Sequence, residues 1–129
     1  NFTSYKAEYG TQLLKNVNSQ NIMRIKNVNL IKKTLDKKFY FKTNNNSFNV
    51  YWQLAIMVKN SEFLRKKALK SNIDIASPSI QLLSRVIKFS KTKNAKNIYK
   101  NLLLIPSYHT LKAHEITSIG RIIKSLCQK

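Results

Sequence analysis

Residues 101–116, NLLLIPSYHTLKAHEI, contain the change of structure on which the predicted fold depends. Residues 102–105 are wholly apolar, and a short apolar run bounded by turn residues indicates a buried strand. Pro106 lacks a backbone N–H and ends that strand. The polar residues 107–110 form a turn, and Thr110 precedes a new helical pattern. We therefore expect a short strand that leads the chain into a closing helix.

Helical patterns lie on both sides of this strand. The segment 94–101 predicts a helix with Ile98, and Leu102 just after it, facing inward. After the turn, apolar residues recur every three or four positions, which predicts one apolar face on a terminal helix. The members of that face are Leu111, Ile116, Ile119, Ile122, Ile123 and Leu126.

A long helical pattern opens the chain. Thr3 or Ser4 offers a hydroxyl that could cap the first turn. The softer stretch NSQN at 18–21 leaves open whether one long helix or two consecutive helices follow. We predict an interdomain-type helical segment over 1–37 and a small α+β domain over 38–129. The apolar positions of the second half, spaced to share one face, are Ile22, Ile25, Val28, Ile31 and Leu35.

The middle of the chain predicts strands and one helix. Residues 38–42, 49–59 and 72–76 indicate strands. The segment 49–59 is led by aromatic residues and is apolar on both faces from Leu54 onward, so it should be a central core strand. Residues 61–70 predict a helix, with Phe63, Leu64 and Leu69 as its buried stripe. Residues 80–89 are assigned to a loop or short helix. The predicted fold class is α+β, an α/β sandwich with a small mixed or antiparallel sheet covered by helices and preceded by a long helix.

The chain is strongly basic. In its 129 residues, 24 Lys and Arg oppose 5 Asp and Glu, a formal net charge of +19. Such a charge is typical of proteins that bind nucleic acid, so a small basic RNA-binding or ribosome-associated protein is the alternative function. The basic residues are spread along the whole chain among many Asn and Ile, which indicates drift toward AT-rich codons. Nucleic acid is therefore a possible partner that we do not favour.

Several features bear on the compartment. The single cysteine, Cys127, cannot form an internal disulfide, so the chain needs no oxidising environment. No apolar run approaches the roughly 20 residues that span a bilayer, and no signal peptide is present. We expect a cytoplasmic protein without a membrane partner. The first residue is Asn1 rather than Met, so we also expect a missing N-terminal part.

The sequence shows no catalytic or metal-binding motif. Gly10 and Gly120 both fall within helical patterns, so neither belongs to a phosphate-binding loop. His109 and His114 straddle a turn beside Glu115 with no third ligand nearby, and we assign no metal site. The five carboxylates are dispersed without forming a pair, so no general acid and base are assigned.

The last third of the chain resembles the C-terminal part of the DegT/DnrJ/StrS family of sugar aminotransferases, which use pyridoxal phosphate. The family closes with a helix, a hydrophobic-x-LP strand, a turn containing His or Tyr with P-x-L-T, and a final helix with an acid in its first turn. In this sequence Leu104 or Ile105 with Pro106, then Tyr108, Leu111 and Glu115, stand at the matching places.

Two earlier segments resemble the same family. Residues 49–76 are similar to its aromatic-led strand, following helix and next strand, with Asn72 where the family usually has glycine. Residues 3–14 are similar to its T/S-E-x-Q-A-A-x-G-x-x-Q-L helix and keep Ala7, Gly10 and Leu14 in step. Together these segments extend the resemblance over essentially the whole chain.

The resemblance implies the small C-terminal domain of a fold-type-I aminotransferase. Such an enzyme acts on a nucleotide-linked keto sugar, in the biosynthesis of cell-surface polysaccharides or deoxyamino sugars. Its Schiff-base lysine would lie upstream of this chain, in a large domain that holds pyridoxal phosphate. We therefore expect this chain alone to be inactive and to bind no cofactor, and the full-length protein to be a homodimer.

The resemblance also implies two site residues. In the family an asparagine just before the first helix reaches the cofactor phosphate of the neighbouring subunit, and Asn1 is near that place. An H-Y-P segment of the family faces the sugar nucleotide. This chain has ASPS at 76–79 instead, which makes Ser77, beside Pro78, the candidate substrate contact.

Overall fold

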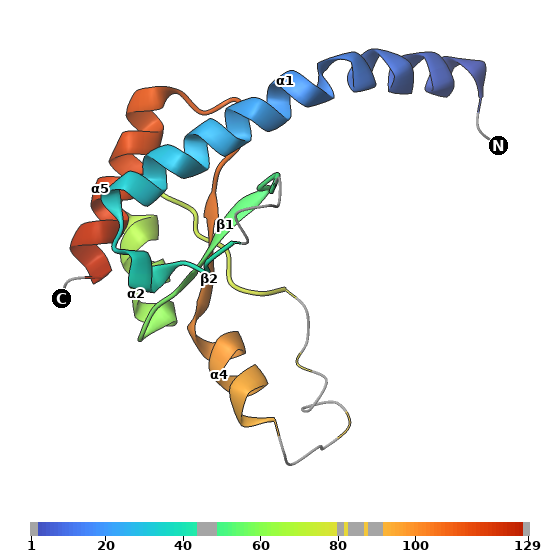
Figure 1. Cartoon of the computed structure of the whole chain (residues 1–129). Coiled ribbons are helices and arrows are strands. Elements are labelled where there is room, and N and C mark those ends of the chain that lie inside the picture. The colour runs from blue at the N-terminus through green and yellow to red at the C-terminus, as the bar shows by residue number, and fades with distance from the viewer. Residues whose placement is uncertain (1–2, 44–48, 80–81, 83–86, 88–91, 128–129) are drawn as a thin grey trace.

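The computed structural model describes residues 3–43, 49–79, 82, 87 and 92–127. Figure 1 shows its helices gathered around a short central sheet. In chain order the elements are α1 (Ser4–Thr34), the 3₁₀ turn η1 (Lys37–Phe39), β1 (Gln53–Met57), α2 (Ser61–Lys70), α4 (Lys93–Asn101), β2 (Leu102–Pro106) and α5 (Ala113–Cys127).

The sheet is antiparallel and has one buried face. β1 pairs with β2 so that Leu54 lies opposite Ile105 and Ile56 opposite Leu103. Because alternate side chains of a strand point to the same face, these four residues line one face together, and all four are buried. The predicted α+β class with a small antiparallel sheet is confirmed, as is the strand at 102–105.

Two of the four predicted strands reduce to single bridges. The predicted strand 38–42 overlaps the turn η1, which spans residues 37–39. Of its residues only Tyr40 forms a β-bridge, with Ile56 of β1. Within 72–76, Ala76 alone pairs, with Leu104 of β2. Each segment therefore contributes one bridge at an outer edge of the sheet, which leaves β1 and β2 as its inner pair.

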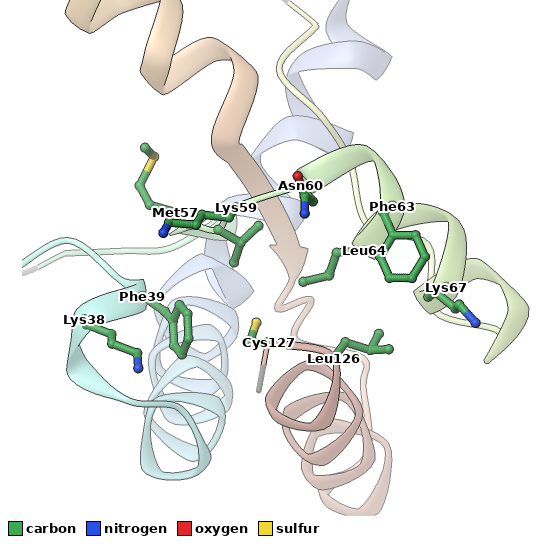
Figure 2. Close-up of a pocket in the computed structure, with 11 residues that line it drawn as sticks. Lys38, Phe39, Met57, Lys59, Asn60, Phe63, Leu64, Lys67, Leu126 and Cys127 are labelled. Atoms are coloured by element: carbon green, nitrogen blue, oxygen red, sulfur yellow. The ribbon is translucent and has the colours of Figure 1, made fainter. Parts of the chain in front are cut away.

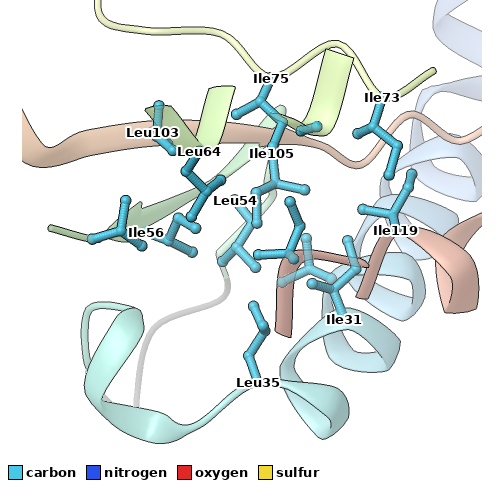
Figure 3. Close-up of a cluster of buried hydrophobic side chains, with 14 of the residues drawn as sticks. Ile31, Leu35, Leu54, Ile56, Leu64, Ile73, Ile75, Leu103, Ile105 and Ile119 are labelled. Carbon is cyan, nitrogen blue, oxygen red and sulfur yellow. The ribbon is translucent and has the colours of Figure 1, made fainter. Parts of the chain in front are cut away.

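Three helices cover the buried face of the sheet. Figure 3 shows their apolar side chains meeting those of β1 and β2 in one cluster. Isoleucine and leucine dominate this cluster, and burying each such side chain contributes about 1.5–3 kcal/mol. The helical members of the core are Val28 and Ile31 of α1, Leu64 and Ala68 of α2, and Ile116, Ile119 and Ile123 of α5.

Helices α1 and α5 approach each other closely at Gly120. Gly120 of α5 faces Thr34 in the last turn of α1, and a Cβ on Gly120 would contact the Thr34 side chain, including its Cβ at 3.2 Å. The space at position 120 therefore accepts the hydrogen of glycine but not the methyl group of alanine. The terminal helix predicted after the turn is confirmed, and its first-turn acid Glu115 accepts a 2.6 Å hydrogen bond from the backbone N–H of Lys112.

Several predictions about buried side chains were wrong. On α2 the buried positions are Leu64 and Ala68, four residues apart, whereas Phe63 and Leu69 point away from the core and are each 58% exposed. Trp52 precedes β1 and is 71% exposed instead of leading a buried strand. Ile98 is exposed, because α4 buries none of its residues.

The N-terminal segment forms one continuous helix rather than two. α1 runs from Ser4 to Thr34, and Thr3 occupies the N-cap position without a side-chain capping bond. No helix in the described part of the chain is long and apolar enough to span a membrane. The division at residue 37 stays a prediction. Residues 80–89, assigned to a loop or short helix, lie outside the described residues except for 82 and 87.

Candidate functional site: the exposed face of helix α1

The apolar face of α1 continues beyond the core that it helps to form. Gly10 and Leu13 precede Val28 and Ile31 by 18 residues each, which is five turns at 3.6 residues per turn, so they share one side of the helix. Val28 and Ile31 are fully buried, whereas Leu13 is 53% exposed. In Figure 1 the N-terminal half of α1 extends away from the rest of the chain.

This exposed surface is rich in large apolar side chains. Tyr5, Tyr9, Leu13 and Val17 follow one another at four-residue spacing and so form a continuous stripe along the helix. All four are exposed, as are Leu14, Ile22 and Met23 near them. A contiguous apolar surface of this kind is typical of an interaction site. We refer to Tyr5, Tyr9, Leu13 and Val17 as the α1 stripe.

Polar contacts fix α1 where it leaves the core. The buried Asn27 donates from Nδ2 to the carbonyl of Tyr108 at 2.7 Å. The fully buried Ser107 donates from Oγ to the carbonyl of Trp52 at 3.0 Å. The turn 107–110 therefore connects the start of α5 to both α1 and the residues before β1, and it sets the direction in which the α1 stripe projects.

Sequence reasoning missed both of these polar residues. Asn27 had a visible signal, because it is a polar residue that directly precedes Val28 on the apolar face of a predicted helix. The signal did not identify its partner, which is 81 residues away. Ser107 was assigned to a turn, and nothing in its neighbours indicates that it would be fully buried.

One lysine differs from the other described lysines. Lys32 of α1 is half-buried, donates from Nζ to the Tyr51 hydroxyl at 3.0 Å and lies over the Tyr51 ring at 4.7 Å and the Tyr40 ring at 5.2 Å. All other lysines that the structure describes are exposed. Lys32 therefore acts as a structural link between α1 and the residues that flank the sheet.

The described residues do not fit pyridoxal phosphate on their own. A Schiff-base lysine needs a desolvated amine to lower its pKa, and no described lysine is buried. The described glycines lie in helices α1 and α5, so no glycine-rich loop is available to hold a phosphate. We therefore derive no reaction step through the cofactor from these residues.

Of the two predicted site residues, the structure describes only Ser77. Asn1 lies outside the described residues. Ser77 is exposed and follows Ala76, the residue that bridges to Leu104 of β2. It lines neither of the two cavities described below. Both assignments stay predictions.

Two surface cavities lie elsewhere on the chain. The larger, about 880 Å³, is bounded by η1, the start of α2 and the end of α5. The smaller, about 400 Å³, lies between residues 71–74 and α5. Among the described residues no group of three or more His, Cys, Asp or Glu could hold a metal ion.

Cys127 lines the larger cavity but is a poor nucleophile. Burial in apolar surroundings raises the pKa of its thiol to about 11, with the charge of Asp36 adding to the effect. A thiol reacts as its thiolate, so at neutral pH this side chain behaves as a small apolar residue. Its position supports packing of the last turn of α5 and not covalent chemistry.

By sequence, the chain matches no protein-family model and none of the curated proteins. By structure, it matches the C-terminal part of DegT/DnrJ/EryC1/StrS sugar aminotransferases. An aminotransferase of that group from Brucella abortus has a TM-score of 0.78 and 12% sequence identity, over 92% of this chain and 34% of its own length. The aminotransferase TlmJ from Streptoalloteichus hindustanus has a TM-score of 0.83 and 10% identity, over 94% of this chain and 35% of its own.

A third matching structure is that of a dehydratase rather than an aminotransferase. The GDP-4-keto-6-deoxy-D-mannose-3-dehydratase of E. coli, solved with bound hydrated PLP, has a TM-score of 0.72 and 15% identity, over 89% of this chain and 33% of its own length. This chain therefore spans about a third of the length of the solved structures that it matches. It has the fold of their C-terminal part, as the sequence resemblance predicted.

Proposed function

We propose that this chain forms the C-terminal domain of a PLP-dependent aminotransferase that acts on a nucleotide-linked keto sugar. The observation that carries the proposal is the α1 stripe, an apolar helix face that leaves the core and finds no partner among the described residues. In the proposed enzyme this stripe packs against a cofactor-binding domain upstream of Asn1. The matched structures are about three times as long as this chain, which is consistent with a further domain in the complete protein.

The energetics favour a covered stripe. Tyr9 and Leu13 are each more than half exposed, and full burial of one such side chain contributes about 1.5–3 kcal/mol. An isolated helix that projects into water gains none of this energy and loses stability through fraying. Contact with a second domain would supply the missing burial along the whole stripe.

Within such an enzyme, this domain would have a supporting role. It would form one wall of the active site, with Ser77 toward the sugar nucleotide and Asn1 toward the cofactor phosphate of the neighbouring subunit. The Schiff-base lysine would come from the upstream domain, so this chain alone would be inactive. The complete enzyme would be a homodimer, since Asn1 would contact the cofactor of the neighbouring subunit. We place the enzyme in the cytoplasm, since the single cysteine of this chain requires no oxidising compartment.

The choice between amino transfer and dehydration rests on sequence resemblance. Both kinds of enzyme occur among the matched structures, so this fold alone is compatible with either reaction. The closing segments 94–126 resemble the sugar aminotransferases, and we favour amino transfer on that ground.

The test uses the complete product of the reading frame that contains this chain. We expect the purified protein to show PLP absorbance and to transfer an amino group to a nucleotide-linked keto sugar. Leu13→Asp should reduce bound cofactor and activity at least about tenfold, because a charge would be buried in the domain contact. Thr11→Asp adds the same charge between Ala7 and Lys15, on the side of α1 away from Leu13, and should leave both unchanged. Equal effects of the two variants, or a complete product without PLP, would contradict the proposal.

A further inference from the structure

The larger cavity combines positive charge with two aromatic rings, of which Phe63 is exposed and Phe39 is half-buried. Its lining includes three lysines, Lys38, Lys59 and Lys67, and two phenylalanines, Phe39 and Phe63, but no carboxylate. Figure 2 shows the two rings on opposite sides of the cavity, with Leu64 and Leu126 between them. The cavity therefore offers ring stacking and anion binding in one place.

The charge in this cavity is only partly neutralised. Lys38 lies 3.5 Å from Asp36. Among the described residues, neither Lys59 nor Lys67 forms an ion pair with a carboxylate, and Glu62 near the start of α2 is engaged by Arg65 and Lys66 instead. An anion that enters the cavity would consequently meet ammonium groups without competing for them against a carboxylate.

The rings are accessible and already attract cations. Phe63 is 58% exposed, and the Lys67 ammonium lies 5.6 Å from its ring centroid. The Lys38 ammonium lies 5.0 Å from the centroid of the Phe39 ring. Each ring thus has a lysine beside it. A base that stacks on the ring takes the place of the ammonium group, and the flexible lysine side chain can then contact a phosphate attached to that base.

From this geometry we propose that the cavity binds a phosphorylated nucleoside, its base stacked on Phe63 and its phosphate held by Lys67. The volume of about 880 Å³ lies within the range of small-molecule sites. The ligand is either a free nucleotide or one nucleotide of a single-stranded nucleic acid, since both present the same base and phosphate. The site is distant in the fold from the α1 stripe and does not depend on the proposed aminotransferase function.

The test is a calorimetric titration of the 129-residue chain with AMP, adenosine and inorganic pyrophosphate. We expect saturable AMP binding with a Kd below about 1 mM, weaker binding of both other probes, and a Kd that rises with salt. Phe63→Leu should weaken AMP binding at least about fivefold, as loss of one stacking contact does. Lys67→Gln should weaken it by a similar factor and reduce its salt dependence.

Two variants on the same helix serve as matched controls. Lys70→Gln removes one exposed positive charge outside the cavity, and Leu69→Ala truncates an exposed apolar side chain outside it. Both should leave the AMP affinity unchanged. The proposal is overturned if AMP does not saturate the chain, if pyrophosphate binds as tightly as AMP, or if Lys70→Gln is as harmful as Lys67→Gln.

A single-stranded oligoadenylate of about ten nucleotides separates the two sources of ligand. Binding at least tenfold tighter than AMP, with a steeper salt dependence, identifies a strand as the ligand. Binding no tighter than AMP identifies a site for free nucleotides. In both cases Phe63→Leu should weaken the oligonucleotide, and an oligonucleotide insensitive to that change would overturn the assignment of this cavity.

Discussion

Gly120 shows how a single residue sets the distance between two helices. A methyl group at this position would be forced against Thr34 of α1. We predict that Gly120→Ala lowers the free energy of unfolding by about 1–3 kcal/mol, as overpacking of a dense core does. Urea denaturation followed by circular dichroism measures the change.

Gly10 supplies the control for this substitution. No atom lies within 4 Å of a Cβ built there, so Gly10→Ala should be neutral or stabilising by up to about 1 kcal/mol. Replacing Thr34 by Ala in the Gly120→Ala chain should recover part of the lost stability. Equal responses at the two glycines would show that helix propensity, not the α1–α5 contact, governs both positions.

Asn27 stabilises the junction between α1 and the turn before α5. Asn27→Ala removes the hydrogen bond from the buried Asn27 to the Tyr108 carbonyl, which should cost about 0.5–1.5 kcal/mol. Asn29→Ala changes an exposed asparagine on the same helix and should have little effect. Thermal unfolding of the two variants compares them directly, and similar melting temperatures would argue against a structural role for Asn27.

Cys127 gives the chain a pH dependence in the alkaline range. Burial raises the pKa of its thiol to about 11 from 9.0, so the folded state favours the neutral form. The resulting stability is fully present below pH 9 and is lost as pH rises through about 11. We predict that iodoacetamide modifies the native thiol much more slowly at pH 8 than the thiol of the urea-unfolded chain. Equal rates, followed by mass spectrometry, would show that Cys127 is not buried.

At the scale of elements, α1 has two halves with different environments. Val28 and Ile31 are fully buried, whereas Tyr9 and Leu13 of the stripe are exposed. In the isolated chain we predict that amides 5–20 exchange hydrogen at least about tenfold faster than amides 28–34, because only the second half is held by packing. Hydrogen exchange with mass spectrometry measures both segments. Uniform protection along α1 would mean that the first half is stabilised without a partner.

The elements that sequence could predict are those with a strong period or an unambiguous boundary. The strand at 102–105 is bounded by Pro106, and α5 repeats isoleucine at helical spacing. The segments around Tyr40 and Ala76 were wrongly assigned as strands, because the number of residues that pair depends on how the segment runs beside its neighbouring strand. The sequence of the segment alone does not give that path. Whether the Phe63 side chain faces the core was also ambiguous in the sequence, because Phe63 and Leu64 are adjacent apolar residues. In the structure α2 buries only Leu64 and Ala68.

The candidate sites could be predicted to a lesser degree than the fold. The basic composition indicates an anionic partner, but only the structure shows that Lys38, Lys59 and Lys67 line one cavity. It also shows that Phe63 lies there beside Lys67. The apolar residues of the α1 stripe are visible in sequence as part of a helix. Their exposure is not, because it depends on where the core ends.

At the scale of the whole molecule, fold and function must be separated. The chain has the fold of the C-terminal part of sugar aminotransferases. Its sequence identity to the matched structures described above is only 10–15%. A fold held at that identity supports several reactions, and the residues that perform them in a PLP enzyme would come largely from an upstream domain. The account therefore depends on whether such a domain precedes Asn1.

The DNA sequence directly upstream of the codon for Asn1 tests this point most directly. We predict an open frame that continues upstream for about twice the length of this chain, because the chain covers about a third of the matched structures. That frame should encode a domain with a candidate Schiff-base lysine. A start or stop codon within a few codons of Asn1 would instead indicate a small basic protein with an uncovered α1 stripe, and the proposed aminotransferase would be wrong.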